Sequence, residues 1–220
     1  MTIFAFAARA VRRFGGAAVL ALAVSGLSAH GEPAPPAAAG ATDPLTLPVA
    51  LPDIIEGSPA AKVTIVEYAS VTCSHCAAFH EETWPSLKKR YLDTGKVKFI
   101  LREFPLDPLS AAGFMLARCA GPDKRDELID VMFEQQKSWA FVPKPGEQLL
   151  ALVKQEGMSQ TDFQTCLRNQ KLFDLLNKSR DLAATRLNID ATPTFFVNGL
   201  KMTGDLSIDE FDKVLTPLLK

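Results

Sequence analysis

The chain has 220 residues, of which 47% are hydrophobic and 22% are charged, with 24 Lys and Arg against 25 Asp and Glu. A chain of this size and composition can bury a full hydrophobic core without depending on disulfides. The net charge of −1 and the lack of a basic run argue against nucleic acid as a partner.

The N-terminal segment is typical of a secretory signal. Arg9, Arg12 and Arg13 precede the apolar run GGAAVLALAVSGLSA, which ends in small residues. A basic start, a short apolar stretch and a small-residue cleavage site define such a signal. The run is shorter than the roughly 18 apolar residues that a membrane-spanning helix needs. We therefore predict that residues 1–31 are a cleaved signal peptide and that the protein is exported to an oxidising space, where disulfides persist.

Two further segments follow the predicted signal. Residues 32–52, EPAPPAAAGATDPLTLPVALP, are rich in Pro and Ala and show no periodic pattern. This composition is typical of an extended tether. The remaining residues, 53–220, have the length of one globular domain.

The first part of that domain predicts a βαβ unit. Residues 62–68, KVTIVEY, are mostly β-branched or apolar and predict a strand, and residues 96–104, KVKFILREF, predict a second strand. Between them we expect a helix over residues 73–91, with a kink at Pro85. Two strands joined by a helix are expected to pair in parallel.

A long helical block comes next. The expected helices cover residues 109–120, 123–138, 146–155, 159–169 and 170–187. Because this block is too long for a simple crossover, we predict an inserted helical subdomain at about residues 107–187.

The chain then returns to the sheet. Residues 193–202, PTFFVNGLKM, predict a hairpin that turns at Asn198-Gly199. Ser207 and Glu210 have the spacing of a capping box, which predicts the start of a last helix over residues 207–218.

Cys73 and Cys76 form a Cys-x-x-Cys motif at the predicted junction of the first strand and its helix. A metal site would need two further soft ligands, and the other cysteines, Cys119 and Cys166, form no second motif of this kind. The tight loop at a helix start disfavours a static disulfide. Unpaired N–H groups at a helix N-terminus favour a thiolate at Cys73, which makes the disulfide more oxidising. We therefore predict a redox-active pair that uses no metal and no cofactor.

Neighbouring residues are candidates for tuning this pair. Ser74 and His75 lie between the cysteines, and a protonated His75 would place a positive charge beside the thiolate. Glu67 lies in the apolar strand that leads to Cys73, where it is either a strand-end surface charge or a buried acid with a functional role. His80, one turn beyond Cys76, is expected to be an ordinary residue on the helix face.

A second motif, Thr192-Pro193, begins the predicted hairpin. A proline there cannot donate to the ladder, and a cis X-Pro bond needs tertiary support. The order strand, Cys-x-x-Cys helix, strand, Thr-Pro, hairpin and helix resembles the thioredoxin fold. With the helical insertion, the chain resembles the periplasmic thiol:disulfide interchange proteins of the DsbA family. The likeness rests on GSPAAKVTIVEYASVTCSHCAAFH, REFPLDPLSAAGFMLARCA and ATPTFFVNG.

This resemblance implies an α/β protein with a thioredoxin fold and an inserted helical subdomain. It implies that Cys73 attacks, that Cys76 resolves, and that Thr192 and a cis Pro193 face the substrate. It also implies a buried Glu67 that takes the proton of Cys76. The expected partners are folding exported proteins with free thiols and a membrane protein that reoxidises the pair with quinone. We expect the protein to be a periplasmic monomer.

Two departures from the best-studied DsbA type leave alternatives open. The chain has Ser-His rather than Pro-His between the cysteines, and Thr192 rather than Val before the proline. Because Thr at that position also occurs in isomerase-like relatives, a disulfide isomerase or reductase is the first alternative to an oxidase. The second alternative is a peptide-binding chaperone with a vestigial redox pair.

Cys119 and Cys166 each lie on an apolar face of a predicted helix. Buried free thiols would show the same pattern. Export to an oxidising space and the even number of cysteines favour a structural disulfide between them.

Overall fold

The computed structural model describes residues 43–220. The predicted signal peptide, residues 1–31, and the predicted tether up to residue 42 lie outside the described residues. The described part is built on a five-stranded sheet with the order β1-β3-β2-β4-β5. The strands are β1 (Ile55–Gly57), β2 (Val63–Ala69), β3 (Val97–Glu103), β4 (Thr194–Val197) and β5 (Leu200–Thr203).

The register of the sheet confirms the predicted βαβ unit. Strands β2 and β3 pair in parallel, with Glu67 opposite Leu101. Strand β4 pairs antiparallel with β2 and forms the predicted hairpin with β5. The turn residues Asn198 and Gly199 have φ values of 46° and 88°, the left-handed conformation that a two-residue hairpin turn requires. The sequence did not predict β1, a three-residue edge strand.

The helix after β2 is interrupted by two π-helical turns. It consists of α1 (Ser74–Ala78), the π-helical turn η2 (Phe79–Thr83), α2 (Trp84–Leu87) and a second π-helical turn, η3 (Lys88–Leu92). The first π turn ends just before Pro85, whose ring nitrogen cannot donate the normal helical hydrogen bond. The predicted helix over residues 73–91 is therefore present, with a distortion at the predicted place.

The predicted helical block is also present. It contains α3 (Pro108–Cys119), α4 (Pro122–Glu134), α5 (Gln136–Trp139), α6 (Pro145–Gln155), α7 (Gln160–Leu167) and α8 (Gln170–Arg186). The one difference is a break at Gln135, which divides the helix expected over residues 123–138. After the hairpin, α9 (Ile208–Leu218) begins with the predicted capping box of Ser207 and Glu210.

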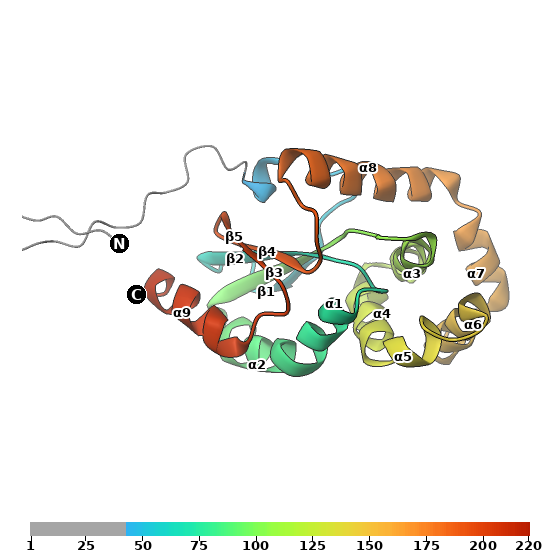
Figure 1. Cartoon of the computed structure of the whole chain (residues 1–220), viewed down its shortest axis with the longest axis horizontal. Coiled ribbons are helices and arrows are strands. Elements are labelled where there is room, and N and C mark those ends of the chain that lie inside the picture. The colour runs from blue at the N-terminus through green and yellow to red at the C-terminus, as the bar shows by residue number, and fades with distance from the viewer. Residues whose placement is uncertain (1–42) are drawn as a thin grey trace, which may run out of the picture. The chain divides into compact units, whose positions relative to one another are not determined.

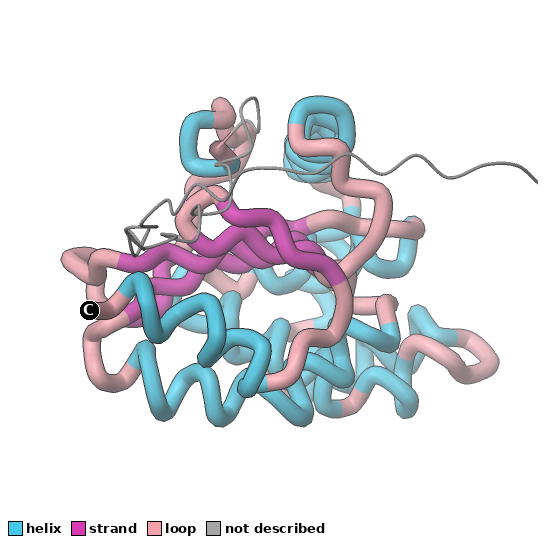
Figure 2. The backbone as a smooth tube through the Cα atoms, turned by 60° about the vertical axis from the view of Figure 1, so that its left-hand side comes forward, coloured by secondary structure: helices cyan, strands magenta, loops and turns pink. Residues whose placement is uncertain are grey.

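Helices cover both faces of the sheet (Figures 1 and 2). Figure 1 shows α8 on one face, α1, α2 and α9 on the other, and α3 to α7 gathered at one end. Because side chains alternate along a strand, β2 contributes Val66 and Tyr68 to the core under α8 and Ile65 and Ala69 to the larger core. By the same alternation, Glu67 points into the larger core, on the side of α1.

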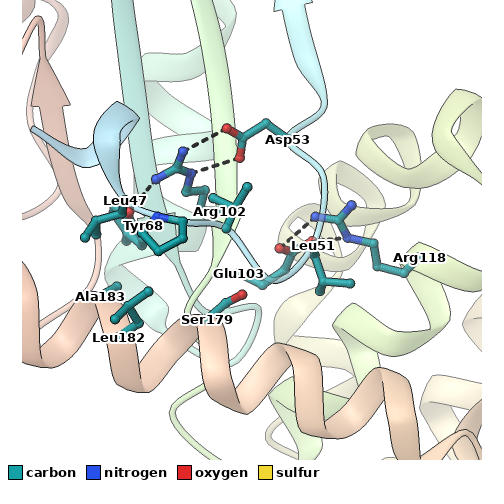
Figure 3. Close-up of a pocket in the computed structure, with 12 residues that line it drawn as sticks. Leu47, Leu51, Asp53, Tyr68, Arg102, Glu103, Arg118, Ser179, Leu182 and Ala183 are labelled. Atoms are coloured by element: carbon teal, nitrogen blue, oxygen red, sulfur yellow. Dashed lines mark hydrogen bonds and ion pairs between the residues drawn. The ribbon is translucent and has the colours of Figure 1, made fainter.

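Residues 43–52, the described part of the predicted tether, contact the domain. Arg102 donates to the carbonyl of Pro44 at 2.7 Å and to Asp53 at 2.8 and 2.9 Å. Leu47 packs against the core under α8. Figure 3 shows Leu47 of this segment and Ala183 of α8 among the side chains that line a pocket together with Tyr68 and Arg102. The core under α8 and the guanidinium of Arg102 give this part of the segment partners to pack against. The composition of the segment alone did not indicate such partners.

Candidate active site

Cys73 lies at the N-cap of α1, in extended conformation with φ −85° and ψ 120°. Its backbone N–H donates to the carbonyl of Ser70 at 3.0 Å, and its own carbonyl accepts the first helical bond, from Ala77, at 3.1 Å. Cys73 is partly exposed, whereas Cys76 is fully buried one turn later, and both are free thiols. The strand-to-helix junction therefore presents one sulfur to solvent and hides the other.

The two thiols differ in acidity. A hydrogen bond from the Cys76 thiol is the largest cause that lowers the pKa of Cys73, to about 5, and the backbone N–H groups of Cys76 and His75 act in the same direction. Partial burial opposes them. For Cys76, burial raises the pKa well above its ordinary value, and the negative charge of Glu67 raises it further. At neutral pH the pair therefore holds a thiolate at Cys73 and a proton on Cys76.

The loop before β4 lies against Cys73. The Thr192–Pro193 peptide bond is cis, as the resemblance implied. The Cys73 sulfur lies 3.2 Å from the Thr192 carbonyl oxygen, to which it donates when the thiol is protonated. The buried Thr192 hydroxyl has no other hydrogen-bond partner among the described residues, and its hydrogen bond to the Cys73 sulfur also lowers the pKa of Cys73. Two motifs that are 119 residues apart in sequence thus meet at one sulfur.

Glu67 is fully buried, which excludes the surface-charge interpretation. Its Oε2 is 2.9 Å from Nε2 of His80, while its Oε1 has no hydrogen-bond partner among the described residues. His80 is 7% exposed and also contacts Asp130 of α4, with 3.3 Å between Nδ1 and Oδ1. The expectation that His80 is an ordinary helix-face residue is therefore wrong. The signal was present in the sequence, because His80 follows Cys76 by four residues and so lies on the same helix face.

His75 and Ser74 contribute differently from the sequence expectation. Both are exposed, and the His75 imidazole is 3.3 Å from Asp205, with 67% of its side chain exposed. What reaches Cys73 is the backbone N–H of His75. The Ser74 side chain makes no hydrogen bond with any of residues 43–220.

The helical insertion holds the loop that carries Cys73. The buried side chain of Gln136 in α5 donates to the carbonyls of Val71 and Cys73, each at 2.9 Å. Gly113 in α3 lies so close that a Cβ there would be 2.9 Å from Val71 Cγ2. Sequence reasoning missed both residues, because nothing local marks a helix that approaches a distant loop.

The remaining cysteines join two helices of the insertion. Cys119 at the end of α3 and Cys166 in α7 form a disulfide, with 6.1 Å between their Cα atoms. This is the pairing that the sequence analysis favoured. Within residues 43–220, no group of three or more His, Cys, Asp or Glu side chains is arranged to bind a metal ion.

A family model described as thioredoxin matches residues 50–216. A protein of Rickettsia conorii with the provisional name protein-disulfide oxidoreductase is 34% identical over 76% of this chain and 61% of its own length. The chain thus spans about three fifths of that relative. Among solved structures, alpha-DsbA1 of Wolbachia pipientis is 31% identical, covers 80% of this chain and 94% of its own, and superposes with a TM-score of 0.70. Oxidised BdbD of Bacillus subtilis, at 23% identity over 76% of this chain and 92% of its own and a TM-score of 0.65, shares the fold.

The family-model match over most of the chain places the protein in the thioredoxin class, and the likeness to alpha-DsbA1 extends over 94% of that protein. This chain belongs to the DsbA family of the thioredoxin superfamily.

Proposed function

We propose that this protein is an exported thiol:disulfide oxidase, which donates a Cys73–Cys76 disulfide to folding proteins with free thiols. The observation that carries the proposal is the contrast between the two sulfurs. The pKa of Cys73 is lowered to about 5, whereas that of buried Cys76 is raised. A stable Cys73 thiolate stabilises the reduced form, so the disulfide form is a strong oxidant.

The reaction proceeds through a mixed disulfide at the exposed sulfur. A substrate thiolate attacks Cys73, the Cys73–Cys76 bond breaks, and Cys76 leaves as a thiolate that takes up one proton. A second substrate thiolate then attacks the substrate sulfur and expels Cys73 as a thiolate. Two substrate thiols are oxidised to a disulfide and the cysteine pair is reduced by two electrons. The low pKa of Cys73 makes it a good leaving group in the second step.

Thr192 and Pro193 support a role in holding the substrate chain. The Thr192 carbonyl oxygen lies 3.2 Å from the Cys73 sulfur and accepts from it when the thiol is protonated. A peptide joined to Cys73 would lie beside the same backbone. On this proposal the helical insertion, through Gln136, holds the backbone of the residue that carries the exposed sulfur.

Export and reoxidation complete the proposal. The predicted signal peptide supports a periplasmic location, and a membrane protein that passes electrons to quinone would restore the disulfide. In the described part of the chain, no helix has the length and apolar character to cross a bilayer.

Equilibration of the cysteine pair with a glutathione redox buffer tests the direction of exchange. A potential near about −120 mV supports the oxidase, whereas a value near about −270 mV would indicate a reductase or an isomerase that works in the reduced state. A Cys73→Ser variant supplies the control. It should lose all oxidation of thiol substrates, and a variant that still prevents substrate aggregation with undiminished effect would support the chaperone alternative.

A further inference from the structure

Release of Cys76 from the disulfide requires a proton to reach a sulfur that solvent does not touch, and resolution by Cys76 requires a proton to leave it. Cys76 is 0% exposed, and when it leaves as a thiolate its raised pKa makes protonation favourable. Glu67 is the acid whose negative charge raises the pKa of Cys76, and it is itself 0% exposed. Glu67 therefore cannot exchange its own proton with water directly.

A chain of side chains connects Glu67 to the surface. Nε2 of His80 lies 2.9 Å from Oε2 of Glu67, and Nδ1 of the same ring lies 3.3 Å from Oδ1 of Asp130. The exposed fractions of the three side chains rise along this chain, from 0% for Glu67 through 4% for His80 to 39% for Asp130. The free Oε1 of Glu67 is the unpaired end of the chain.

We propose that Glu67, His80 and Asp130 form a proton relay that carries one proton between solvent and Cys76 during disulfide exchange. The proposal deepens the proposed function and rests on it. In the oxidising direction, Glu67 gives a proton to the departing Cys76 thiolate, His80 replaces that proton, and Asp130 delivers the next one from water. One proton enters at Asp130 for each Cys76 thiol formed. When Cys76 resolves a mixed disulfide, one proton leaves its thiol and passes through the same three side chains to water.

The electrostatics of the ring fit this role. Burial alone would lower the pKa of His80, but the charges of Glu67 and Asp130 outweigh it and raise the pKa to about 9. The imidazole is therefore protonated at neutral pH and can donate from both nitrogens. Burial raises the pKa of Glu67 against the opposing effect of His80. Glu56 of β1 interacts with both His80 and Asp130, and Asp126 of α4 and Lys88 of η3 act on Glu56 in turn. The charge of Cys73 acts on Glu67.

Packing fixes the geometry of the relay. The His80 ring stacks on Phe133 of α4, with 4.2 Å between centroids and 24° between planes. Phe79 and Trp84 lie against its other sides, at 5.2 and 5.7 Å. A ring held in this way keeps both nitrogens aligned with their carboxylates, which a freely rotating surface histidine would not do.

The test is the single-turnover reduction of the disulfide form by excess reduced glutathione, followed by acid quench and thiol alkylation. Asp130→Asn keeps a hydrogen-bond acceptor for His80 but cannot carry a proton. We expect it to slow the release of Cys76 about tenfold. A group that transfers the proton directly contributes about a hundredfold or more, and Asp130 acts two side chains away from the sulfur. Added imidazole should restore the rate of the variant and leave the wild type unchanged. The equilibrium constant with glutathione should stay within about twofold, because a relay changes rates and a partly exposed charge is screened.

Two further variants separate a relay from a structural effect. Glu127→Gln removes an exposed charge from the same helix and should react at the wild-type rate. His80→Gln should be slow, and the double variant with Asp130→Asn should be no slower than His80→Gln alone, because both act on one path. Additive losses, an unchanged Asp130→Asn rate, or a loss that imidazole does not restore would overturn the relay. A wild-type disulfide that fails to react with glutathione would instead overturn the proposed function.

Discussion

Cys73 and Cys76 have the same side chain three residues apart, but the fold lowers the pKa of the first thiol and raises the pKa of the second. The difference comes from position. Cys73 ends an extended loop at a helix N-terminus, where backbone N–H groups lack helical partners. Cys76 faces the core beside Glu67, where burial disfavours a charge. The motif and its helix start could be predicted from the sequence. The residues alone left Glu67 open between a surface charge and a buried acid, and only the family resemblance implied its burial.

The first prediction concerns the source of the Cys73 acidity. In Cys76→Ala the hydrogen bond from the Cys76 thiol is lost, and this bond is the largest cause that lowers the pKa of Cys73. We expect that pKa to rise from about 5 but to stay below the ordinary value of 9.0, because the backbone donors remain. Ultraviolet absorbance of the thiolate during titration measures it.

His75→Ser is the matched comparison for this titration. It keeps the backbone N–H and removes only an imidazole that lies beside Asp205, so its effect should be the smaller one. A larger rise in His75→Ser than in Cys76→Ala would mean that the imidazole controls the thiolate, as the sequence alone suggested.

Among the elements, the helical insertion holds the active-site loop, and two of its own helices are joined by a disulfide. Gln136 of α5 supplies two hydrogen bonds to that loop, and the Cys119–Cys166 disulfide joins α3 to α7. Helical periodicity was enough to predict the block of helices. It could not predict the contacts of α5, because the break at Gln135 that turns Gln136 inward depends on tertiary packing.

Gln136→Leu should both destabilise the protein and raise the pKa of Cys73. The change leaves the buried carbonyl of Val71 without a donor, which costs about 1–3 kcal/mol. The Cys73 carbonyl loses one of its two donors and still accepts from Ala77. It also loosens the backbone that presents the N–H groups of α1 to the thiolate. Urea denaturation and thiolate titration measure the two effects, with the exposed neighbour change Gln135→Leu as the control. A variant with normal stability would show that water replaces the amide.

Replacing both Cys119 and Cys166 with Ser should affect stability and leave exchange intact. The bond closes a loop with a sequence separation of 47, for which the chain-entropy relation gives up to about 4 kcal/mol. The bond lies in the insertion, between α3 and α7, and not at the Cys73 helix. Thermal unfolding should show the loss, and single-turnover reduction by glutathione should keep its wild-type rate. A slower exchange rate in the fully folded variant would contradict this separation.

At the scale of the whole molecule, the sheet is tied to its surroundings by a few buried charges. Arg102 ties β3 to Asp53 and Pro44 of the N-terminal segment, and Glu103 ties β3 to α3 and α4. The βαβ unit, the insertion and the hairpin were predictable because each has a local pattern. The packing of residues 43–52 was not, because an arginine in a strand gives no sign of which distant carbonyl it will meet.

Glu103 is the clearest test of these ties. It accepts hydrogen bonds from Arg118 at 2.6 Å and from Arg125 at 2.7 Å, and Arg125 is fully buried. Burial alone would raise the pKa of Glu103, but Arg125 and Arg118 outweigh it and lower the pKa to about 2 from 4.5. Since the folded pKa lies below the unfolded one, this stabilisation is complete above about pH 4.5 and is lost as the pH falls towards 2.

Glu103→Gln should therefore cost about 3–5 kcal/mol at pH 7, because it leaves a buried guanidinium without its main counter-charge. The difference from the wild type should shrink as the pH falls from 4.5 to 2, where the wild-type carboxylate is itself protonated. Urea denaturation across this range measures both quantities, and Glu134→Gln, at an exposed position of α4, is the matched control. A loss that does not change with pH would show that the carboxylate matters for its shape and hydrogen bonds, and that its charge contributes nothing to stability.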